Sequence, residues 1–401
     1  MFSAADEILI AIPALLVGGT ELHTLALART LQSAGARVRV CCYYEHTPAM
    51  VMALEELGVE VRLLRLERAM GLWHLMRVLH DLFIRLHPSA VHVQHLAPGL
   101  IPIVAAKAAR IRTVFATVHQ PGDCFGMREH LLFSLAARLC TAFFCVSQAV
   151  ERSWFGNSAV FSTQAAALGR QHFTIYNGVD ANRTNEKSAH IDCGAVKANL
   201  GLVGRRVIGV VARLRVEKGH ASIINALPLV MKAVPDVALL VVGDGPDGAG
   251  LVEQARSLGV LQQIVWTGQR SPEEALDLFT AMDVVVVPSQ FEGFGLSAAE
   301  AMAAGRPVVG TRVGGLAEII EDGVTGYLIA PGDETALADA LIRVLGDPVA
   351  AATMGARGRI RVCEHFSNER FSETFVDAYR YFMNRTAFAK GAADRIPVAR
   401  R

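Results

Sequence analysis

Short apolar segments alternate with longer amphipathic segments along almost the whole chain. The apolar segments are rich in β-branched residues, as in Asp283–Pro288, where four valines follow one another. A run this short and this β-branched is typical of a strand that is buried on both faces of a parallel sheet. Because the longer segments have helical periodicity, the pattern predicts an α/β protein with parallel sheets.

The first half of the chain contains one complete series of such elements. The stretch 181–199 that follows is polar and has no clear period, so we interpret it as a linker. The predicted strands cover residues 7–13, 37–43, 59–66, 90–96, 113–119, 142–147 and 173–179, and the main helices cover residues 21–34, 72–86, 101–110 and 128–139.

A second α/β series begins after the predicted linker. One of its helices has a clear start, because Ser271 and Glu274 form a capping box with Pro272 at the first helical position. The predicted strands cover residues 206–212, 237–242, 264–267, 283–288, 307–310 and 327–330. Two closing helices and a frayed tail are expected at residues 350–364, 368–384 and 387–401.

Length and composition narrow the class of protein. A chain of 401 residues exceeds a usual single domain, so we expect two domains. Hydrophobic residues make up 52% and charged residues 19% of the chain, which supports a large core and argues against disorder. The net charge of +1 gives no sign of a nucleic-acid partner.

The cysteines and the amino-terminal residues indicate the cellular compartment in which the protein is expected. The seven cysteines are odd in number, scattered and without a C-x-x-C pair, so neither a zinc site nor a disulfide framework is expected. The apolar run Ile8–Val17 is too short to span a bilayer and contains Pro13. We therefore expect a cytoplasmic protein, and peripheral contact with the inner face of a membrane stays open.

The stretch from Glu292 to Glu300 contains the most informative chemistry. It joins a buried strand to a helix through a loop with two glycines, and such junctions bind ligands in open α/β folds. The free amides near Gly295, Leu296 and Ser297 suit a phosphate. The two carboxylates suit hydroxyl groups instead. A ligand with a sugar, then phosphates, then another sugar would use all three parts.

This stretch resembles the E-x7-E motif of the retaining GT-B glycosyltransferases of family 4, also called group 1. The likeness continues through Gly305–Thr311 and Gly314–Ile320. It implies a GT-B fold, in which two Rossmann-like domains face a central cleft and the C-terminal helix crosses back to the first domain. The implied domains are an N-terminal acceptor-side domain over 1–190 with 368–401 packed on it, and a C-terminal nucleotide-sugar-binding domain over 200–367.

The resemblance also implies catalytic residues, which are His119, Arg213, Lys218 and Glu292. Arg213 and Lys218 would be ordinary surface cations if they stood alone, but the family holds the donor diphosphate at these positions. His119 would approach the donor sugar, and Glu292 would bind sugar hydroxyls. The implied donor-binding residues are Gly18, Gly19, Gly243, Gly268, Gly293, Phe294, Gly295, Leu296 and Glu300, of which Glu300 would bind the ribose hydroxyls.

The sequence thus predicts a retaining glycosyltransferase that uses a UDP- or GDP-sugar and a hydroxyl acceptor. The acceptor would belong to cell-surface polysaccharide, glycolipid or small-glycoside synthesis, and both a lipid-linked acceptor and a growing glycan are open. No D-x-D motif is found where a metal-dependent enzyme would have it, so we expect no metal and no cofactor.

Three other hypotheses remain. These are a sugar-nucleotide epimerase of the same fold, a non-catalytic glycosyltransferase-like subunit and a nicotinamide-dependent dehydrogenase. The missing G-x-G-x-x-G after the first strand counts against the dehydrogenase.

Overall fold

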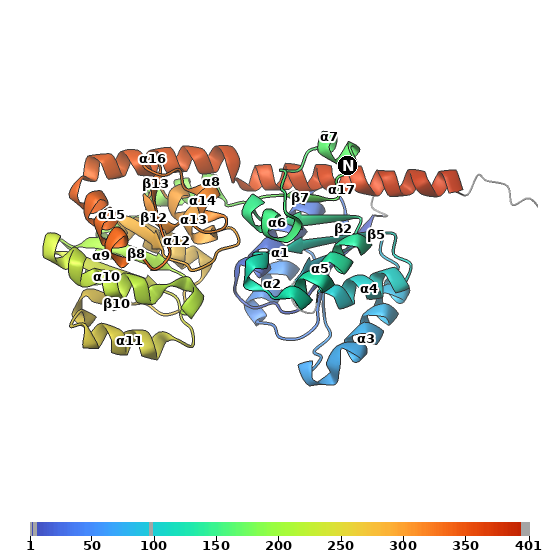
Figure 1. Ribbon diagram of the computed structural model, residues 1–401, viewed down its shortest axis with the longest axis horizontal. Coiled ribbons are helices and arrows are strands. Elements are labelled where there is room, and N and C mark those ends of the chain that lie inside the picture. The colour runs from blue at the N-terminus through green and yellow to red at the C-terminus, as the bar shows by residue number, and fades with distance from the viewer. Residues whose placement is uncertain (1, 3–5, 96–98, 394–401) are drawn as a thin grey trace, which may run out of the picture. The chain divides into compact units, whose positions relative to one another are not determined.

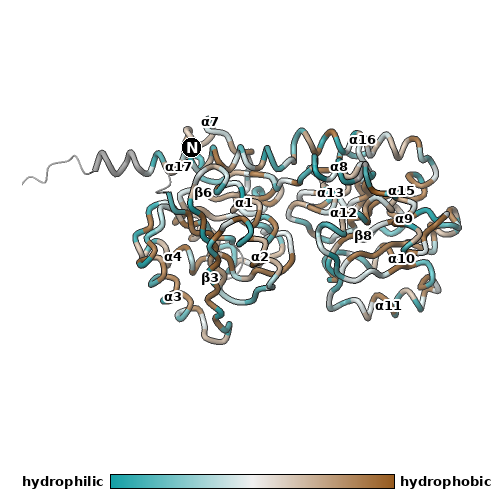
Figure 2. The backbone as a smooth tube through the Cα atoms, turned by 180° about the vertical axis from the view of Figure 1, so that it is seen from behind, coloured by the Kyte–Doolittle hydropathy of each residue, from teal (hydrophilic) through white to brown (hydrophobic). Residues whose placement is uncertain are grey.

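The computed structural model describes residues 2, 6–95 and 99–393 (Figure 1). The chain divides into two compact units, residues 1–178 with 369–401 and residues 179–368. Each unit is built around one parallel sheet with helices packed against it, which confirms the predicted pair of Rossmann-like domains. Figure 2 shows hydrophobic residues along the strands, and most strand side chains are buried, those of the edge strand β3 excepted.

The first unit contains a seven-stranded parallel sheet in the order β3-β2-β1-β4-β5-β6-β7. The order reverses direction between β1 and β4, so a topological switch point lies there. The strands are β1 (Glu7–Ile12), β2 (Arg37–Cys42), β3 (Glu60–Leu63), β4 (Ala90–His95), β5 (Thr113–Val118), β6 (Ala142–Cys145) and β7 (His172–Thr174).

The helices of the first unit include one from the far end of the chain, α17 (Asn368–Ala393; red in Figure 1). Its side chains Phe371, Phe375 and Tyr379 belong to the same buried cluster as Phe115 of β5, so the predicted return of the last helix is confirmed. The other helices are α1 (Gly19–Ser33), α2 (Pro48–Glu55), α3 (Gly71–Leu86), α4 (Leu100–Ala108), α5 (Met127–Leu139), α6 (Gln148–Phe155) and α7 (Thr163–Ala167).

The second unit contains a six-stranded parallel sheet in the order β10-β9-β8-β11-β12-β13. Its strands are β8 (Arg206–Val211), β9 (Val237–Val242), β10 (Ile264–Trp266), β11 (Val284–Val287), β12 (Val308–Thr311) and β13 (Gly326–Ile329). Its helices are α8 (Ala181–His190), α9 (Cys193–Asn199), α10 (His220–Ala233), α11 (Gly248–Ser257), α12 (Pro272–Ala281), α13 (Leu296–Ala303), α14 (Leu316–Ile319), α15 (Glu334–Gly346) and α16 (Pro348–His365).

The predicted linker is wrong, because residues 181–199 form the two helices α8 and α9. Asp180 caps the first helix by accepting from the backbone N–H of Arg183, and Asp192 caps the second by accepting from Ala195. Their sequence is polar because few of their described side chains are buried, Ala181 and Thr184 being the buried ones in α8. Helix α8 contacts α12, α13 and α16, and α9 contacts α12. The first unit consequently ends at Gly178, before the predicted boundary at residue 190.

Other boundaries differ less. The capping box at Ser271 is present as predicted. The last strand of the first sheet covers only His172–Thr174 instead of residues 173–179; it pairs with β6, and Thr174 also forms a bridge to Val160. The closing helix α17 runs nine residues past the predicted end at 384, to Ala393, so the predicted frayed tail is wrong for residues 387–393; residues 394–401 lie outside the described part of the chain.

No helix in the described part of the chain combines the length and the apolar character that crossing a bilayer requires. All seven cysteines are free thiols.

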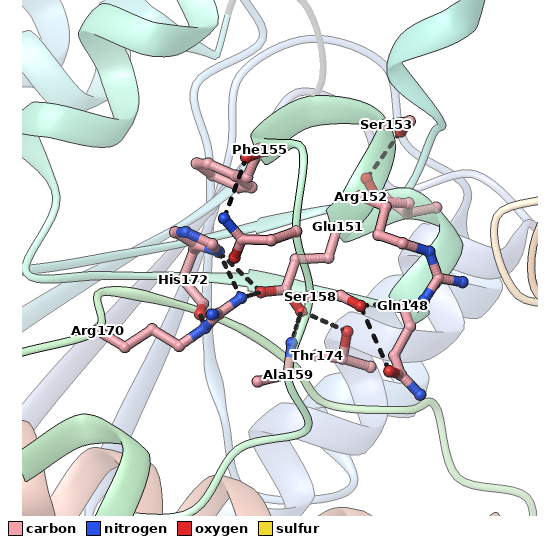
Figure 3. A network of polar contacts seen from close by, with 12 residues as sticks. Gln148, Glu151, Arg152, Ser153, Phe155, Ser158, Ala159, Arg170, His172 and Thr174 are labelled. Atoms are coloured by element: carbon pink, nitrogen blue, oxygen red, sulfur yellow. Dashed lines mark hydrogen bonds and ion pairs between the residues drawn. The ribbon is translucent and has the colours of Figure 1, made fainter. Parts of the chain in front are cut away.

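A buried carboxylate fixes the edge of the first sheet (Figure 3). Glu151 on α6 accepts hydrogen bonds from Arg170 (2.6 Å), His172 (2.7 Å), Thr174 (2.7 Å) and the backbone N–H of Ala159 (3.1 Å). Burial alone would raise the pKa of Glu151, but the hydrogen bonds from His172, Arg170 and Thr174 outweigh burial and hold the pKa below its ordinary value. The carboxylate thereby attaches strand β7 to helix α6.

We predict that Glu151→Gln lowers the free energy of unfolding at pH 7 by about 3 kcal/mol, since it leaves the Arg170 cation without its buried partner. The depressed pKa means that the carboxylate stabilises the fold fully above its unfolded pKa, about 4.3, and loses this effect as the pH falls through the folded pKa. Urea unfolding at pH 7 and pH 3 measures both effects. Equal stability of the two proteins at pH 7 would contradict the prediction.

Candidate functional site

Two loops meet at the switch point of the second sheet. Strands β8 and β11 are neighbours, while β9 and β10 lie beyond β8 and β12 and β13 lie beyond β11. The chain therefore leaves β8 and β11 in opposite directions, and open α/β sheets bind ligands outside the carboxyl ends of the strands at such a point. The loop after β8 contains Arg213 and Lys218, and the loop after β11 contains Glu292.

Lys218 and Glu292 form an ion pair across this switch point. The Lys218 Nζ donates to the Glu292 Oε2 at 2.7 Å, and the Ser289 hydroxyl donates to the same oxygen at 3.1 Å. Both charged side chains keep some solvent contact, with exposed fractions of 23% and 15%. Two residues predicted from separate motifs are thus brought together, and a ligand is able to reach both.

Close backbone contact holds these two loops together. A Cβ atom added to Gly219, which has a φ of +71°, would lie 1.9 Å from the Pro288 carbonyl oxygen. The backbone N–H of Gln290 also donates to the Glu217 carbonyl oxygen at 2.9 Å. Only glycine allows this approach, so the spacing between Lys218 and Glu292 is determined by the main chain.

The loop that carries Glu292 is supported from its other side. Added Cβ atoms at Gly314 and Gly315 would lie 1.7 Å from the Glu292 carbonyl oxygen and 2.4 Å from the Phe294 carbonyl oxygen. The backbone N–H of Gly315 donates to the same Glu292 oxygen at 3.3 Å. The turn at 313–315 therefore acts as a platform for the Glu292 loop.

Helix α13 begins at Leu296, and no side chain of a described residue caps it. Gly295 precedes it with a φ of +109°, and a Cβ atom there would lie 2.6 Å from a Leu316 methyl carbon. The first turn of the helix therefore presents uncapped amides and the positive end of the helix dipole beside the loop of Gly293 and Phe294. Such a helix start is suited to an anion.

Glu300 lies one turn into α13 and is only partly exposed. Its carboxyl group forms no hydrogen bond or ion pair with any described residue. Burial raises its pKa to about 7. An acid without a protein partner and with a raised pKa is poised to bind hydroxyl groups from outside the protein.

Three other predicted residues lie at the same edge of the sheet. Arg213 is exposed, and its guanidinium has no hydrogen-bond or ion-pair partner in the parts of the chain that are described. Gly243 follows β9 and packs on the carbonyl of Ala212, where an added Cβ atom would lie 2.0 Å from the oxygen. Its N–H donates to the carbonyl of Gly268, which follows β10, at 3.0 Å. The loops after four neighbouring strands are thus in contact.

The remaining predicted residues belong to the first unit. Gly18 is the N-cap of α1 and Gly19 its first residue; the helix follows β1 after the loop 13–17, and no side chain of a described residue caps it. His119 follows β5, and its Nε2 is 2.7 Å from the Oε1 of Gln94 on β4. The ring of His23 on α1 lies edge to face with that of His119, with centroids 4.8 Å apart.

Sequence reasoning missed Ser289, Gln94 and His23 as contributors. Gln94 carries a visible signal, since it is a polar residue at a position that a buried parallel strand would fill with an apolar one. His23 has no such signal, because one histidine on a helix is ordinary. The sequence gives no signal for Ser289 either, because its contribution is the 3.1 Å hydrogen bond to Glu292, which only the structure reveals.

The described residues contain no cluster of three metal-ligating side chains. The second unit instead offers a cation in Lys218, uncapped amides at α13 and two carboxylates in different environments. This set of groups is able to bind an anion with hydroxyl groups on either side of it.

The raised pKa of Glu300 predicts a cost to the ligand-free fold. The unfolded side chain ionises near pH 4.3 and the folded one near pH 7, so the stability of the fold falls as the pH rises through that window. Glu300→Gln removes the ionised form, and we expect it to stabilise the ligand-free protein at pH 8 by about 2 kcal/mol. The gain should vanish at pH 4.

Thermal unfolding at both pH values measures this effect, with Glu364→Gln as the matched control because Glu364 is an exposed glutamate of the same unit. A Glu300→Gln protein that is less stable than the parent at pH 8 would show that Glu300 serves the fold.

Two family models match the chain in succession. "Glycosyltransferase Family 4" matches residues 17–183, and "Glycosyl transferases group 1" matches residues 196–361. The chain is 31% identical over 207 residues to the N-acetyl-alpha-D-glucosaminyl L-malate synthase of Bacillus anthracis, which covers 51% of this chain and 52% of that protein. It is 37% identical over 205 residues to a glycogen synthase of Mycobacterium tuberculosis, covering 51% and 47%. The chain thus spans about half the length of these curated relatives.

Solved structures share the fold. The structure of HepE from Anabaena, in complex with UDP and glucose, matches with a TM-score of 0.78 and 22% identity, covering 94% of this chain and 99% of that one. Both halves of the chain match glycosyltransferase models, and the whole matches the GT-B architecture. The chain therefore belongs to the glycosyltransferases of group 1 and family 4.

Proposed function

We propose that this chain transfers a sugar from a UDP- or GDP-linked donor to a hydroxyl acceptor, with retention at the anomeric carbon and without a metal ion. The observation that carries the proposal is the Lys218–Glu292 pair beside the unpartnered Glu300 at the switch point of the second sheet. A cation and an unpartnered acid close to a helix start match the alternating chemistry of a nucleotide-diphosphate sugar.

Lys218 would stabilise the departing diphosphate. When the glycosidic bond breaks, its electron pair moves to the phosphate oxygen, and negative charge grows there. An ammonium group already held in place by Glu292 meets that charge without reorganisation, and such preorganised contacts are usually worth about 3 kcal/mol. Arg213, exposed on the same loop, would supply the second cation.

The two acids would orient the rest of the donor. Glu300 would accept hydrogen bonds from the ribose hydroxyls, and Glu292 would accept them from hydroxyls of the transferred sugar. The amides at Gly295 and Leu296 would face the phosphates. The predicted cleft between the two domains, in which His119 and Gly18–Gly19 would complete the site, stays part of this proposal.

Retention needs no further protein group in this scheme. The acceptor oxygen attacks the anomeric carbon on the face that the diphosphate leaves, and its proton passes to the departing phosphate oxygen. One carbon–oxygen bond breaks, one forms and the proton is accounted for. Neither a divalent ion nor a cofactor enters the balance.

The comparisons support the donor class. HepE was solved with UDP and glucose, so UDP-glucose is the first donor to try. The names of the relatives point to different acceptors, from L-malate to glycogen. We accordingly propose a hydroxyl acceptor in cell-surface polysaccharide, glycolipid or small-glycoside synthesis without choosing among them.

The first test is a panel of UDP-glucose, UDP-N-acetylglucosamine and GDP-mannose with the purified protein in excess EDTA. We expect one donor to raise the melting temperature of the protein. The same donor should be hydrolysed or transferred at the same rate with and without EDTA. NMR of the product should show the donor's own anomeric configuration. A requirement for Mg²⁺ or Mn²⁺, or an inverted product, would overturn the mechanism.

The same panel separates the other hypotheses. An epimerase would convert the donor into an isomeric sugar nucleotide with no acceptor present. A non-catalytic subunit would bind a donor and release no nucleotide diphosphate under any condition.

The proposed contact of Lys218 predicts a large kinetic effect. Lys218→Met should lower kcat for hydrolysis of UDP-glucose by about 100-fold, because one preorganised charge contact is lost. Arg215→Met is the matched control, since Arg215 lies on the same loop and pairs with Glu217 at 2.9 Å. Coupled detection of released UDP measures both variants, and equal rates would exclude Lys218 from the site.

A further inference from the structure

A fully buried glutamine joins two histidines in the first unit. The Oε1 of Gln94 lies 2.7 Å from the Nε2 of His119, and the Nε2 of Gln94 lies 3.3 Å from the Nδ1 of His23. Gln94 has no exposed surface, and His23 is 3% exposed. The amide therefore has both of its ends engaged by imidazole rings.

The two ends of the amide act differently on the two rings. A carbonyl oxygen only accepts, so the facing Nε2 of His119 carries a proton. An amide nitrogen only donates, so the facing Nδ1 of His23 carries a lone pair. Burial, with smaller contributions from His119 and His92, lowers the pKa of His23 well below its ordinary value, so that ring is neutral and its proton resides on Nε2.

This tautomer leaves the buried Nε2–H donor of His23 without an acceptor among the described residues. The His23 ring packs against the rings of Phe371 and Phe375 on α17. A buried unsatisfied polar atom usually costs about 1–3 kcal/mol, and a leucine at this position would avoid the cost. Retaining histidine here is explained if its Nδ1 is needed to orient the Gln94 amide.

Neighbouring groups leave the amide little freedom to turn. His92, two residues before Gln94 on the same face of β4, pairs with the Thr117 hydroxyl at 2.8 Å and with the Tyr379 hydroxyl at 2.5 Å. Thr117 lies directly opposite Gln94 in the sheet register. Both ring nitrogens of His92 are thus engaged, and the hydrogen bonds of the Gln94 amide run to His23 and His119.

We propose that Gln94 is a positioning residue that holds His119 in its Nε2–H tautomer and in one ring orientation, and that His23 sets the direction of the Gln94 amide. This inference rests on the proposed function, in which His119 approaches the donor sugar. A ring with one tautomer and one orientation presents the same hydrogen-bonding pattern to every donor molecule, whereas an unrestrained ring would present it only part of the time.

Kinetics of three variants test the inference. Gln94→Leu keeps the volume and removes the acceptor, and we expect kcat for UDP-glucose hydrolysis to fall about 30-fold while KM changes less than threefold. Gln94→Glu restores an acceptor for His119 and lets His23 donate from Nδ1, so it should recover most of the activity. Thr117→Val, which removes only the bond to His92, should lose stability and keep its rate.

A double variant separates positioning from packing. If His23 acts only through Gln94, the variant His23→Leu with Gln94→Leu should be no slower than Gln94→Leu alone. The inference would be overturned if the fold losses in kcat of the two single variants multiplied in the double variant. It would also be overturned if folded Gln94→Leu had the same kcat as the parent.

The tautomer itself can be observed without turnover. Ring ¹⁵N labels on histidine, with His119→Ala to identify the signals, should show His119 as Nε2–H in the parent and a mixture in Gln94→Leu. An Nδ1–H form of His119 in the parent would refute the inference even if the enzyme is active. A parent that shows Nε2–H but turns over no donor would instead refute the proposed function and the catalytic value of the positioning.

Discussion

The candidate site of the second unit is centred on the ion pair between Lys218 and Glu292. The two residues are 74 positions apart in sequence and come together because β8 and β11 are adjacent where the sheet reverses direction. The main chain maintains the distance, through Gly219 against Pro288 and through the 313–315 turn against the Glu292 loop. A charge held this way is ready before a ligand arrives, which is the condition under which electrostatic contacts contribute most to catalysis.

In the first unit, uncharged polar side chains position the proposed catalytic residue, His119. A line of polar side chains, His92, Gln94 and Thr117, runs between two buried strands toward His119. Helix α17 packs Phe371 and Phe375 against His23, and its Tyr379 hydroxyl bonds to His92. The last helix of the chain therefore contributes to the surroundings of the residues that contact His119. Excluding water from such a line makes each hydrogen bond count more and each missing one cost more.

In each unit, one residue of the proposed site lowers the stability of the ligand-free fold. Among the described residues, the desolvated Glu300 carboxyl group has no hydrogen-bond or ion-pair partner, and the buried N–H of His23 has no acceptor. Neither feature helps the fold, whereas the fully buried Glu151 has both oxygens hydrogen-bonded and belongs to the structural framework. A buried polar group without a partner costs stability, and at Glu300 and His23 this cost falls on residues proposed to bind the donor or to position a catalytic group.

The sequence alone determined the α/β class, most strand positions and the capping box at Ser271, because apolar periodicity, glycines and caps act over a few residues. It could not reveal that residues 181–199 form two helices, since the contacts of α8 with α12, α13 and α16 and of α9 with α12 are made by tertiary packing. Only the tertiary structure joined Lys218 to Glu292 and His119 to Gln94, and only it raised the pKa of Glu300, because strand order and burial arise from contacts between distant parts of the chain.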